Sequence, residues 1–308
     1  MSMTTSDHPP VVLVPPPVLF VSHGAPTFAL EPSKLGAELR KLGQTLLTST
    51  TTISSLISSS PPSSIRAILV ISAHWQTSKS NCVTIMTHPS PPTLYDFSGF
   101  DDALYQLKYP ASGPSQELVQ RTVECLSKAG WNNAELDSKR GYDHGAWVPL
   151  LHLFPSHPNT TIPVFQISMP RDLTPSRAIE LGQALAPLRY EEGVFIIGSG
   201  GTTHNLFEGL RNPMYATPSP KAMEFAMWVR KCIRANDAKS LVKYKSLAPH
   251  ADWAHPTLEH YLPLLVAMGA SNSDNNNNNN PGDAKVQVME GGYTYGVLAM
   301  DAYLWGGP

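Results

Sequence analysis

Three of the 11 histidines follow short apolar segments of the kind that form buried strands. They are His23 after residues 18–22, His74 after residues 65–72, and His204 just past residues 193–199. The carboxyl ends of the strands form the ligand crevice of an open α/β sheet, so three imidazoles at such ends can converge on one point. Imidazole serves as a metal ligand and as a general acid or base. The pattern therefore indicates one polar site at the edge of a sheet.

Two further histidines are candidates for the same site. His260 opens a predicted helix over residues 257–270 that is apolar on most sides. A polar group at the start of a buried helix needs a partner, and a metal would serve. His144 lies beside Asp143 between two glycine-containing turns. His255 is close to His260 in the sequence and is a rival for its role.

Each candidate also has a simpler explanation, because one buried histidine is more often a hydrogen-bonded core residue than a ligand. The chain has no HExxH or CxxC pattern, and Ser199 lacks the G-x-S-x-G context of a nucleophile elbow. The aromatic segments 95–100 and 104–110 are either packed loops or a wall against a planar ligand. The remaining histidines are interpreted as structural or surface residues: His8, His88, His152, His157 and His250.

Composition disfavours several classes of protein. The 308 residues are 42% hydrophobic and 15% charged, with a net charge of −2, so there is no basic excess for binding nucleic acid. No apolar run approaches the ~20 residues of a membrane span. The first residues have no cationic segment before their apolar stretch, unlike a signal peptide. Three scattered cysteines indicate neither a disulfide framework nor a zinc–thiolate site, and favour a reducing, cytoplasmic location.

Strand and helix patterns alternate along the chain. This predicts one α/β domain with a central, mainly parallel or mixed sheet flanked by helices. Strands are expected over 18–22, 65–72, 82–87, 162–168, 193–199, 286–290 and 295–303. Helices are expected over 32–47, 116–129, 147–154, 175–189, 220–235 and 257–270. Residues 1–17 are expected to be a flexible tail before a domain spanning 18–308, with surface insertions at 48–64 and 271–284, the second containing a polyasparagine run.

Seven short motifs then appear in an order that resembles one known family. They are Ser22-His23-Gly24, Ser72-Ala73-His74-Trp75, residues 95–100, Tyr109-Pro110-Ala111, and residues 143–147, 198–206 and 256–264. From about residue 18 to the carboxyl terminus, the chain resembles the DOPA 4,5-dioxygenase group of class III extradiol ring-cleaving dioxygenases. The resemblance implies a single α/β domain with one non-haem metal, usually Fe(II), although relatives with Zn(II) are known. It also implies a small aromatic diol and O2 as substrates and a semialdehyde product.

The same resemblance implies a role for each of the five histidines. His23 and His74 match imidazole ligands, and His260 stands where other class III enzymes use a glutamate. His260 is preferred to His255 because the Glu-His pair before Leu-Pro-Leu-Leu is the matching part. Glu259 would point about 100° away from His260 on a helix.

His204 matches the family's catalytic base, and in zinc-loaded relatives it reaches the metal, so it is also a candidate ligand. His144 matches a second active-site histidine. The alternatives are a zinc-dependent hydrolase, because three histidines and a water also form a hydrolytic site, and a non-enzymatic binding protein on the same fold. No nucleic-acid or membrane partner is expected, and the sequence does not indicate an oligomeric state.

Overall fold

The computed structural model describes residues 15–51, 65–155, 162–209, 211–271 and 286–307. Within these ranges eight strands form one sheet in the order β4-β3-β5-β2-β6-β1-β8-β7. Their bounds are β1 Val18–Ser22, β2 Ala67–Thr77, β3 Cys82–Met86, β4 Asn133–Asp137, β5 Val164–Pro170, β6 Val194–Gly200, β7 Val286–Thr294 and β8 Leu298–Trp305. The four central strands, β5, β2, β6 and β1, are parallel, whereas β8 and β3 join them antiparallel. The prediction of one α/β domain with a mixed sheet is confirmed.

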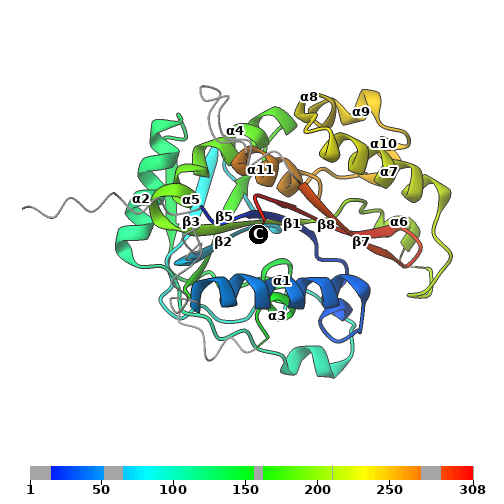
Figure 1. The fold of residues 1–308 in the computed structure, drawn as a ribbon, viewed down its shortest axis with the longest axis horizontal. Coiled ribbons are helices and arrows are strands. Elements are labelled where there is room, and N and C mark those ends of the chain that lie inside the picture. Colours follow the sequence, from blue (N-terminus) through cyan, green and yellow to red (C-terminus); the bar gives the residue numbers. More distant parts are fainter. Residues whose placement is uncertain (1–14, 52–64, 156–161, 210, 272–285, 308) are drawn as a thin grey trace, which may run out of the picture.

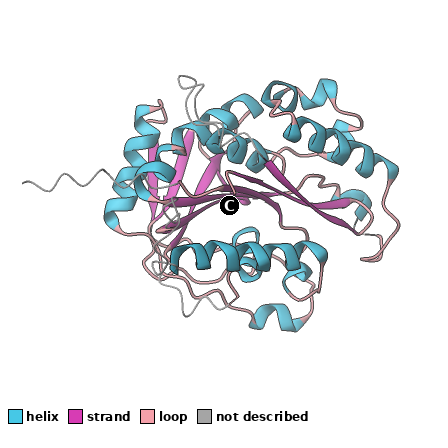
Figure 2. Ribbon diagram, viewed as in Figure 1, coloured by secondary structure: helices cyan, strands magenta, loops and turns pink. Residues whose placement is uncertain are grey.

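Helices cover both faces of the sheet (Figures 1 and 2). On one face lie α1 (Lys34–Thr51), α3 (His144–Leu153) and the short 3-10 helix η1 (Pro26–Ala29). On the other lie α2 (Gln116–Lys128), α4 (Pro175–Leu185), α5 (Pro187–Glu192), α7 (Pro220–Arg234) and α11 (Leu262–Ser271). The connections contain η2 (Asp102–Gln106), α6 (Leu206–Gly209), α8 (Ala238–Val242), α9 (Tyr244–Leu247) and α10 (Ala251–Ala254). No helix within the described ranges combines the length and apolar character needed to cross a membrane.

Helices α1 and α11 illustrate how the pattern of apolar residues determines burial. In α1 the leucines at helical spacing, Leu35, Leu39, Leu42 and Leu46, are buried on one side of the helix. Helix α11 is apolar all round, and every one of its residues is buried because it packs between α4 and the strands β6 and β1. The two helices α4 and α11 approach closely at Gly182 and Gly269. A Cβ atom on Gly182 would lie 2.0 Å from the carbonyl oxygen of Val266, so only glycine fits this crossing.

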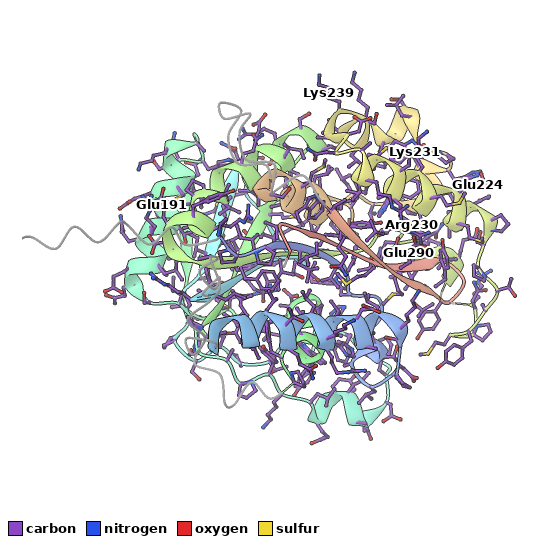
Figure 3. The ribbon with its side chains drawn as sticks, viewed as in Figure 1. Glu191, Glu224, Arg230, Lys231, Lys239 and Glu290 are labelled. Carbon is purple, nitrogen blue, oxygen red and sulfur yellow. The ribbon has the colours of Figure 1, made fainter. Side chains whose placement is uncertain are left out.

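A buried ion pair attaches α7 to the sheet, and a series of polar contacts connects this pair to the end of β1. Arg230 donates two hydrogen bonds of 3.0 Å to Asp301 in β8 and also pairs with Glu290 of β7 at 3.3 Å (Figure 3). Tyr303 donates to the same Asp301 carboxylate, and its hydroxyl lies 3.3 Å from that of Thr202. The backbone N–H of Thr202 donates in turn to Ser22, the last residue of β1. This network holds the chain directly before His23.

Several predicted boundaries are wrong. Strand β2 continues to Thr77 instead of ending at residue 72, so His74 lies inside the strand, in a stretch where the pairing with β5 shifts register. Helix α11 begins at Leu262, and residues 257–261 form turns. The helix expected over 175–189 is divided into α4 and α5 at Ala186. Tyr295, expected in a strand, lies in the turn between β7 and β8.

Other differences concern the tail, the insertions and one strand. Pro16 and Pro17 are buried, and the carbonyl of Pro16 accepts a hydrogen bond from Arg189, so the last residues of the expected tail pack on the domain. Helix α1 continues to Thr51, which makes the start of the 48–64 segment helical. Residues 52–64 and the polyasparagine run lie outside the described residues. Strand β4 was not predicted, because its largely exposed sequence, NAELD, lacks an apolar face.

Gly182→Ala should destabilise the domain, because the new methyl group would meet the Val266 carbonyl in backbone that cannot rotate away. We expect a loss of about 1–3 kcal/mol in the free energy of unfolding, the usual effect of overpacking. Urea unfolding followed by circular dichroism measures it. The matched control is Gln183→Ala, at the adjacent exposed position of the same helix. An unchanged midpoint for Gly182→Ala would show that the two helices can move apart freely.

Candidate functional site

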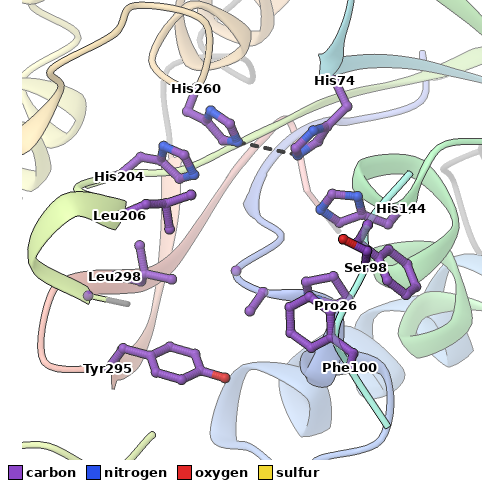
Figure 4. Close-up of a pocket in the computed structure, with 14 residues that line it drawn as sticks. Pro26, His74, Ser98, Phe100, His144, His204, Leu206, His260, Tyr295 and Leu298 are labelled. Atoms are coloured by element: carbon purple, nitrogen blue, oxygen red, sulfur yellow. Dashed lines mark hydrogen bonds between the residues drawn. The ribbon is translucent and has the colours of Figure 1, made fainter. Parts of the chain in front are cut away.

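The structure brings all five predicted histidines together at one end of the parallel strands, and Figure 4 shows four of them, His74, His144, His204 and His260. They come from five separate segments: His23 directly after β1, His74 within β2, His144 at the start of α3, His204 after β6, and His260 in the turn before α11. His23 and His260 are almost completely buried, and His74 is partly exposed. Residues up to 237 positions apart therefore share one site only because of the order of the strands.

Three of these imidazoles face one another through the same ring atom. The Nε2 atom of His74 lies 3.0 Å from Nε2 of His23. It also lies 3.3 Å from Nε2 of His260 (Figure 4). The three residues form a group whose ligand atoms all lie within 4.8 Å of one another and could hold a metal ion. His144 and His204 flank this group, with ring centroids 3.9 Å from His74 and 3.3 Å from His260, respectively.

Hydrogen bonds at the opposite ring nitrogens identify the tautomers of His23 and His260. Ser199 donates its only hydroxyl proton to the carbonyl of Gly145, so its oxygen accepts from Nδ1 of His23 at 2.9 Å. Nδ1 of His260 donates to the Glu259 carboxylate at 3.0 Å. Nδ1 of His74 faces the Asp96 carboxylate at 3.7 Å, too far for a hydrogen bond, but the negative charge there favours a proton on this nitrogen. With the proton on Nδ1 in each ring, three Nε2 lone pairs point at one another. Such lone pairs cannot hydrogen-bond among themselves, so the arrangement fits a bound cation.

Burial keeps these imidazoles neutral. It lowers the pKa of His23 and of His260 well below the ordinary value, and the neighbouring imidazoles lower both pKa values further. Burial also lowers the pKa of His74 to about 4, with a further contribution from His144. A neutral imidazole is the form that donates a lone pair to a metal. The lowered pKa values and the tautomers therefore both favour metal binding by these imidazoles.

Two carboxylates complete the surroundings, and both approach the histidines from the Nδ1 side. Asp96 accepts from Nδ1 of His144 at 3.0 Å and from its backbone N–H at 2.9 Å. Partial burial would raise the pKa of Asp96, but these hydrogen bonds outweigh it and hold that pKa at about 2. Two further groups could hold a metal, His74–Asp96–His144 and His204–Glu259–His260. Because their carboxylates already pair with imidazole Nδ1 atoms, we regard Asp96 and Glu259 as orienting groups.

A network around Asp143 fixes His74. Asp143 is fully buried and caps α3, and it accepts hydrogen bonds from Ser72, Gln166 and Arg140. The Ser72 hydroxyl oxygen accepts from the backbone N–H of His74. Gly145 allows α3 to approach this bulge, since a Cβ there would lie 2.3 Å from the Ser72 hydroxyl. The irregular part of β2 is therefore held from behind, which fixes the direction of the His74 ring.

A pocket of about 350 Å³ opens from the imidazoles toward the surface (Figure 4). His74, His144, His204 and His260 line its inner end, and the walls are mostly apolar and aromatic. The other lining residues are Gly24, Ala25, Pro26, Phe97, Ser98, Phe100, Leu206, Gly209, Tyr295 and Leu298. The pocket is within the ~300–1,000 Å³ range of small-molecule sites. It is large enough for one substituted aromatic ring, and its inner end is where such a ring would meet the polar groups.

His255 does not join this site. Its ring is buried among Phe225, Tyr244 and Tyr261, and its Nε2 donates to the carbonyl of Thr202 at 3.0 Å. The other histidines within the described ranges are also distant from the cluster: His152 bonds to the carbonyl of Phe28, His250 pairs with Glu224, and His88 accepts from Ser90. His8 and His157 lie outside the described residues.

Sequence reasoning missed some of the groups that complete the site. Glu259 was expected to point away from His260, but the turn at 257–261 brings its carboxylate back to the ring. Ser199 carries no nucleophile motif, yet it orients His23. Asp96 lies within the aromatic motif, which indicated a wall and not a hydrogen-bond acceptor. No local signal identifies Tyr295 or Leu298, because only the β7–β8 turn brings them to the pocket.

Comparisons with known proteins agree with this geometry. The model of the family described as "Catalytic LigB subunit of aromatic ring-opening dioxygenase" matches residues 17–294. A Beta vulgaris protein named 4,5-DOPA dioxygenase extradiol is 35% identical over 92% of this chain and 94% of its own length. A protein of the same name from Escherichia coli (strain K12) is 35% identical over 82% of this chain and 84% of its own. The fold is similar to the crystal structure of an uncharacterized protein from Escherichia coli K12, with a TM-score of 0.66, 28% identity, and coverage of 94% and 98%.

The burial of His255 should make stability depend on pH. Burial lowers its pKa to about 3, so between pH 3 and 6.5 the unfolded chain binds a proton that the folded chain does not. Stability from this group is complete above pH 6.5 and is lost as the pH falls, by about 1.4 kcal/mol per unit. Between pH 7 and 5 the wild type should therefore lose about 2 kcal/mol more than His255→Gln, which has no titrating ring. Urea unfolding with a chelator present measures the difference, and equal losses would contradict the assignment.

Proposed function

This chain belongs to the family of the catalytic LigB subunit of aromatic ring-opening dioxygenases, and we propose that it opens the ring of a catechol to a semialdehyde. It is an extradiol ring-cleaving dioxygenase, so its substrates are an aromatic compound and O2. DOPA, after which several relatives are named, is one such catechol. The observation that carries the proposal is the convergence of three imidazole Nε2 atoms at the inner end of an apolar pocket, with two further imidazoles beside them.

The proposed metal ligands are His23, His74 and His260, with Fe(II) the metal for ring opening and Zn(II) an alternative occupant. The three Nε2 lone pairs and the paired Nδ1 atoms support this assignment. When bound, iron would supply the electron transfer that allows O2 to react with the ring. For zinc, His204 is a candidate additional ligand, because it belongs to a possible metal-holding group with His260 and Glu259.

The pocket would bind the catechol with its two hydroxyls toward the imidazoles and its ring between apolar walls. Phe97 supports this placement, because its ring packs edge-on against His144 at 5.7 Å and against Phe100 at 5.5 Å. Such rings prefer edge or offset contacts with another aromatic ring. The same apolar walls would exclude water from the reacting ring, which limits side reactions of reactive oxygen species.

His204 is the proposed general base. Burial lowers its pKa to about 4, so the ring is neutral near pH 7 and can accept a proton from a catechol hydroxyl. Its backbone N–H donates to the carbonyl of Ala254 at 2.8 Å, and its ring stacks on His260 with planes 8° apart, so its position is fixed.

His144 is the proposed second proton carrier. Its Nδ1 donates to the Asp96 carboxylate, which leaves Nε2 as the ring atom that can exchange a proton. The ring could therefore hold a proton and return it when the catechol ring opens. His144 also lines the pocket opposite His204, so the two imidazoles would flank the bound ring (Figure 4).

We also propose a cytoplasmic location. All three cysteines, Cys82, Cys125 and Cys232, are buried and free. Buried free thiols are compatible with a reducing compartment.

The proposed ligands can be tested by metal analysis. Alanine substitution of His23, His74 or His260 should weaken metal binding by more than the ~10–100-fold that loss of an orienting partner costs. Metal content after anaerobic loading with Fe(II) or Zn(II) and desalting measures this. The matched control is His255→Ala, which should keep the metal because His255 bonds only to a backbone carbonyl. Metal loss in His255→Ala combined with retention in His260→Ala would reverse the assignment.

The role of His204 can be separated from metal binding. His204→Ala should retain Fe(II) but lose ring cleavage by ~10²-fold or more, the usual effect of removing a general base. Initial rates are read from the coloured ring-opened product, with His250→Ala at the exposed Glu224 pair as the control. Near-normal turnover by His204→Ala would exclude it as the base.

A further inference from the structure

We propose that the pocket selects catechols whose ring substituent is uncharged and apolar, in preference to the zwitterionic side chain of DOPA. This inference rests on the proposed function, because it assumes that the catechol hydroxyls bind at the imidazole end. The substituent then extends toward the outer part of the pocket. The residues that line that part therefore determine which substituents are accepted.

No charged side chain of Asp, Glu, Lys or Arg lines the pocket within the described residues. Away from the imidazoles the walls are formed by Pro26, Phe100, Leu298 and Tyr295, and Leu206 lies beside His204 (Figure 4). Away from the histidines, the polar side-chain atoms of the lining are the hydroxyls of Ser98 and Tyr295. Neither hydroxyl can neutralise an ammonium or a carboxylate. A zwitterionic substituent would lose its hydration on binding without gaining an ionic partner, which costs free energy. An apolar substituent would be stabilised by the same burial.

The carboxylates near the site, Asp96 and Glu259, do not line the pocket. Asp96 accepts hydrogen bonds from Nδ1 and from the backbone N–H of His144. Glu259 accepts from His260 and from the hydroxyl of Thr257. Both lie at the imidazole end, away from the expected position of the substituent. The two acidic groups are therefore already used in orienting the histidines.

Tyr295 is held against the outer part of the pocket at a cost in backbone energy. Its φ of 54° lies in the left-handed region, which is unfavourable for a bulky residue. Its N–H donates to the carbonyl of Met214 at 2.7 Å, and its own carbonyl accepts from Asn212 at 2.9 Å. Its hydroxyl lies 3.3 Å from that of Thr27. These contacts fix an aromatic ring, and not a charge, where the substituent would lie (Figure 4).

The test compares four catechols that differ in the charge of one substituent. They are 4-propylcatechol (neutral), dopamine (cation), 3-(3,4-dihydroxyphenyl)propanoate (anion) and L-DOPA (zwitterion). Dissociation constants are measured anaerobically on the metal-loaded protein, and kcat/KM is measured with O2. We expect 4-propylcatechol to exceed L-DOPA by at least ~10-fold in both affinity and kcat/KM, because unpaired charges are costly to desolvate.

The variant Leu206→Arg tests whether an added positive charge makes the pocket accept an anionic substituent. Leu206 is 42% exposed, so an arginine there can reach the outer part of the pocket without disturbing the core. It should raise kcat/KM for the anion relative to 4-propylcatechol by at least ~10-fold, through a new ionic partner. Leu206→Gln, a polar residue without charge, is the matched control and should not produce this change in the ratio.

The outcomes distinguish a failure of the proposed selectivity from a failure of the proposed function. L-DOPA bound and cleaved as well as 4-propylcatechol would overturn the selectivity but leave the proposed function standing. Failure to cleave any of the four catechols would contradict the proposed function, and the anaerobic dissociation constants would still decide the selectivity. An unchanged ratio in a folded Leu206→Arg would show that the substituent does not lie near Leu206, which also overturns the inference.

Discussion

The site depends on three imidazole lone pairs that point at one another. Without a cation between them this arrangement is unfavourable. Each neutral ring carries its one proton on Nδ1, so none of the three Nε2 atoms can donate a hydrogen bond to another. Ser199, Glu259 and Asp96 stand behind the three rings and favour this tautomer. Burial then keeps the rings uncharged. The protein has therefore fixed both the direction and the protonation state of its proposed ligands.

The fold supplies rigid supports for each ligand. His23 follows β1, whose last residue is joined to α7 by the chain of polar groups from Arg230 through Asp301 and Tyr303. His74 lies in a bulge that Asp143 holds from α3. The His260 carbonyl accepts from the N–H of Gly201 at 2.9 Å, so its turn is attached to the end of β6. Each imidazole is thus positioned by a different element of the sheet or its helices, which gives a site that local flexibility cannot easily disturb.

Sequence reasoning predicted the class of fold and the main histidines for physical reasons. Apolar runs such as residues 193–199 are typical of buried parallel strands, and strand ends are where α/β proteins place ligands. His204 was identified because it follows such a strand. His260 was identified because it lies beside a buried helix. Choosing His260 over His255 needed the family resemblance, because both are buried histidines near the same helix.

Other features depend on tertiary structure that a local pattern does not encode. The irregular stretch of β2 that contains His74 is held by Asp143, whose partners are distant in the sequence. Strand β4 forms because β3 offers it hydrogen bonds, although its residues are polar and exposed. The contact of Glu259 with His260 requires a turn where helical periodicity predicts a helix. Tyr295 reaches the pocket only because its backbone adopts a conformation that its residue type disfavours.

The central claim is that one metal ion binds at the meeting point of three imidazole Nε2 atoms. Anomalous diffraction from crystals of the zinc-loaded protein tests it most directly. We expect one peak, about 2.0–2.1 Å from Nε2 of His23, His74 and His260. A peak on the Nδ1 side of His144, coordinated by the Asp96 carboxylate, would contradict it.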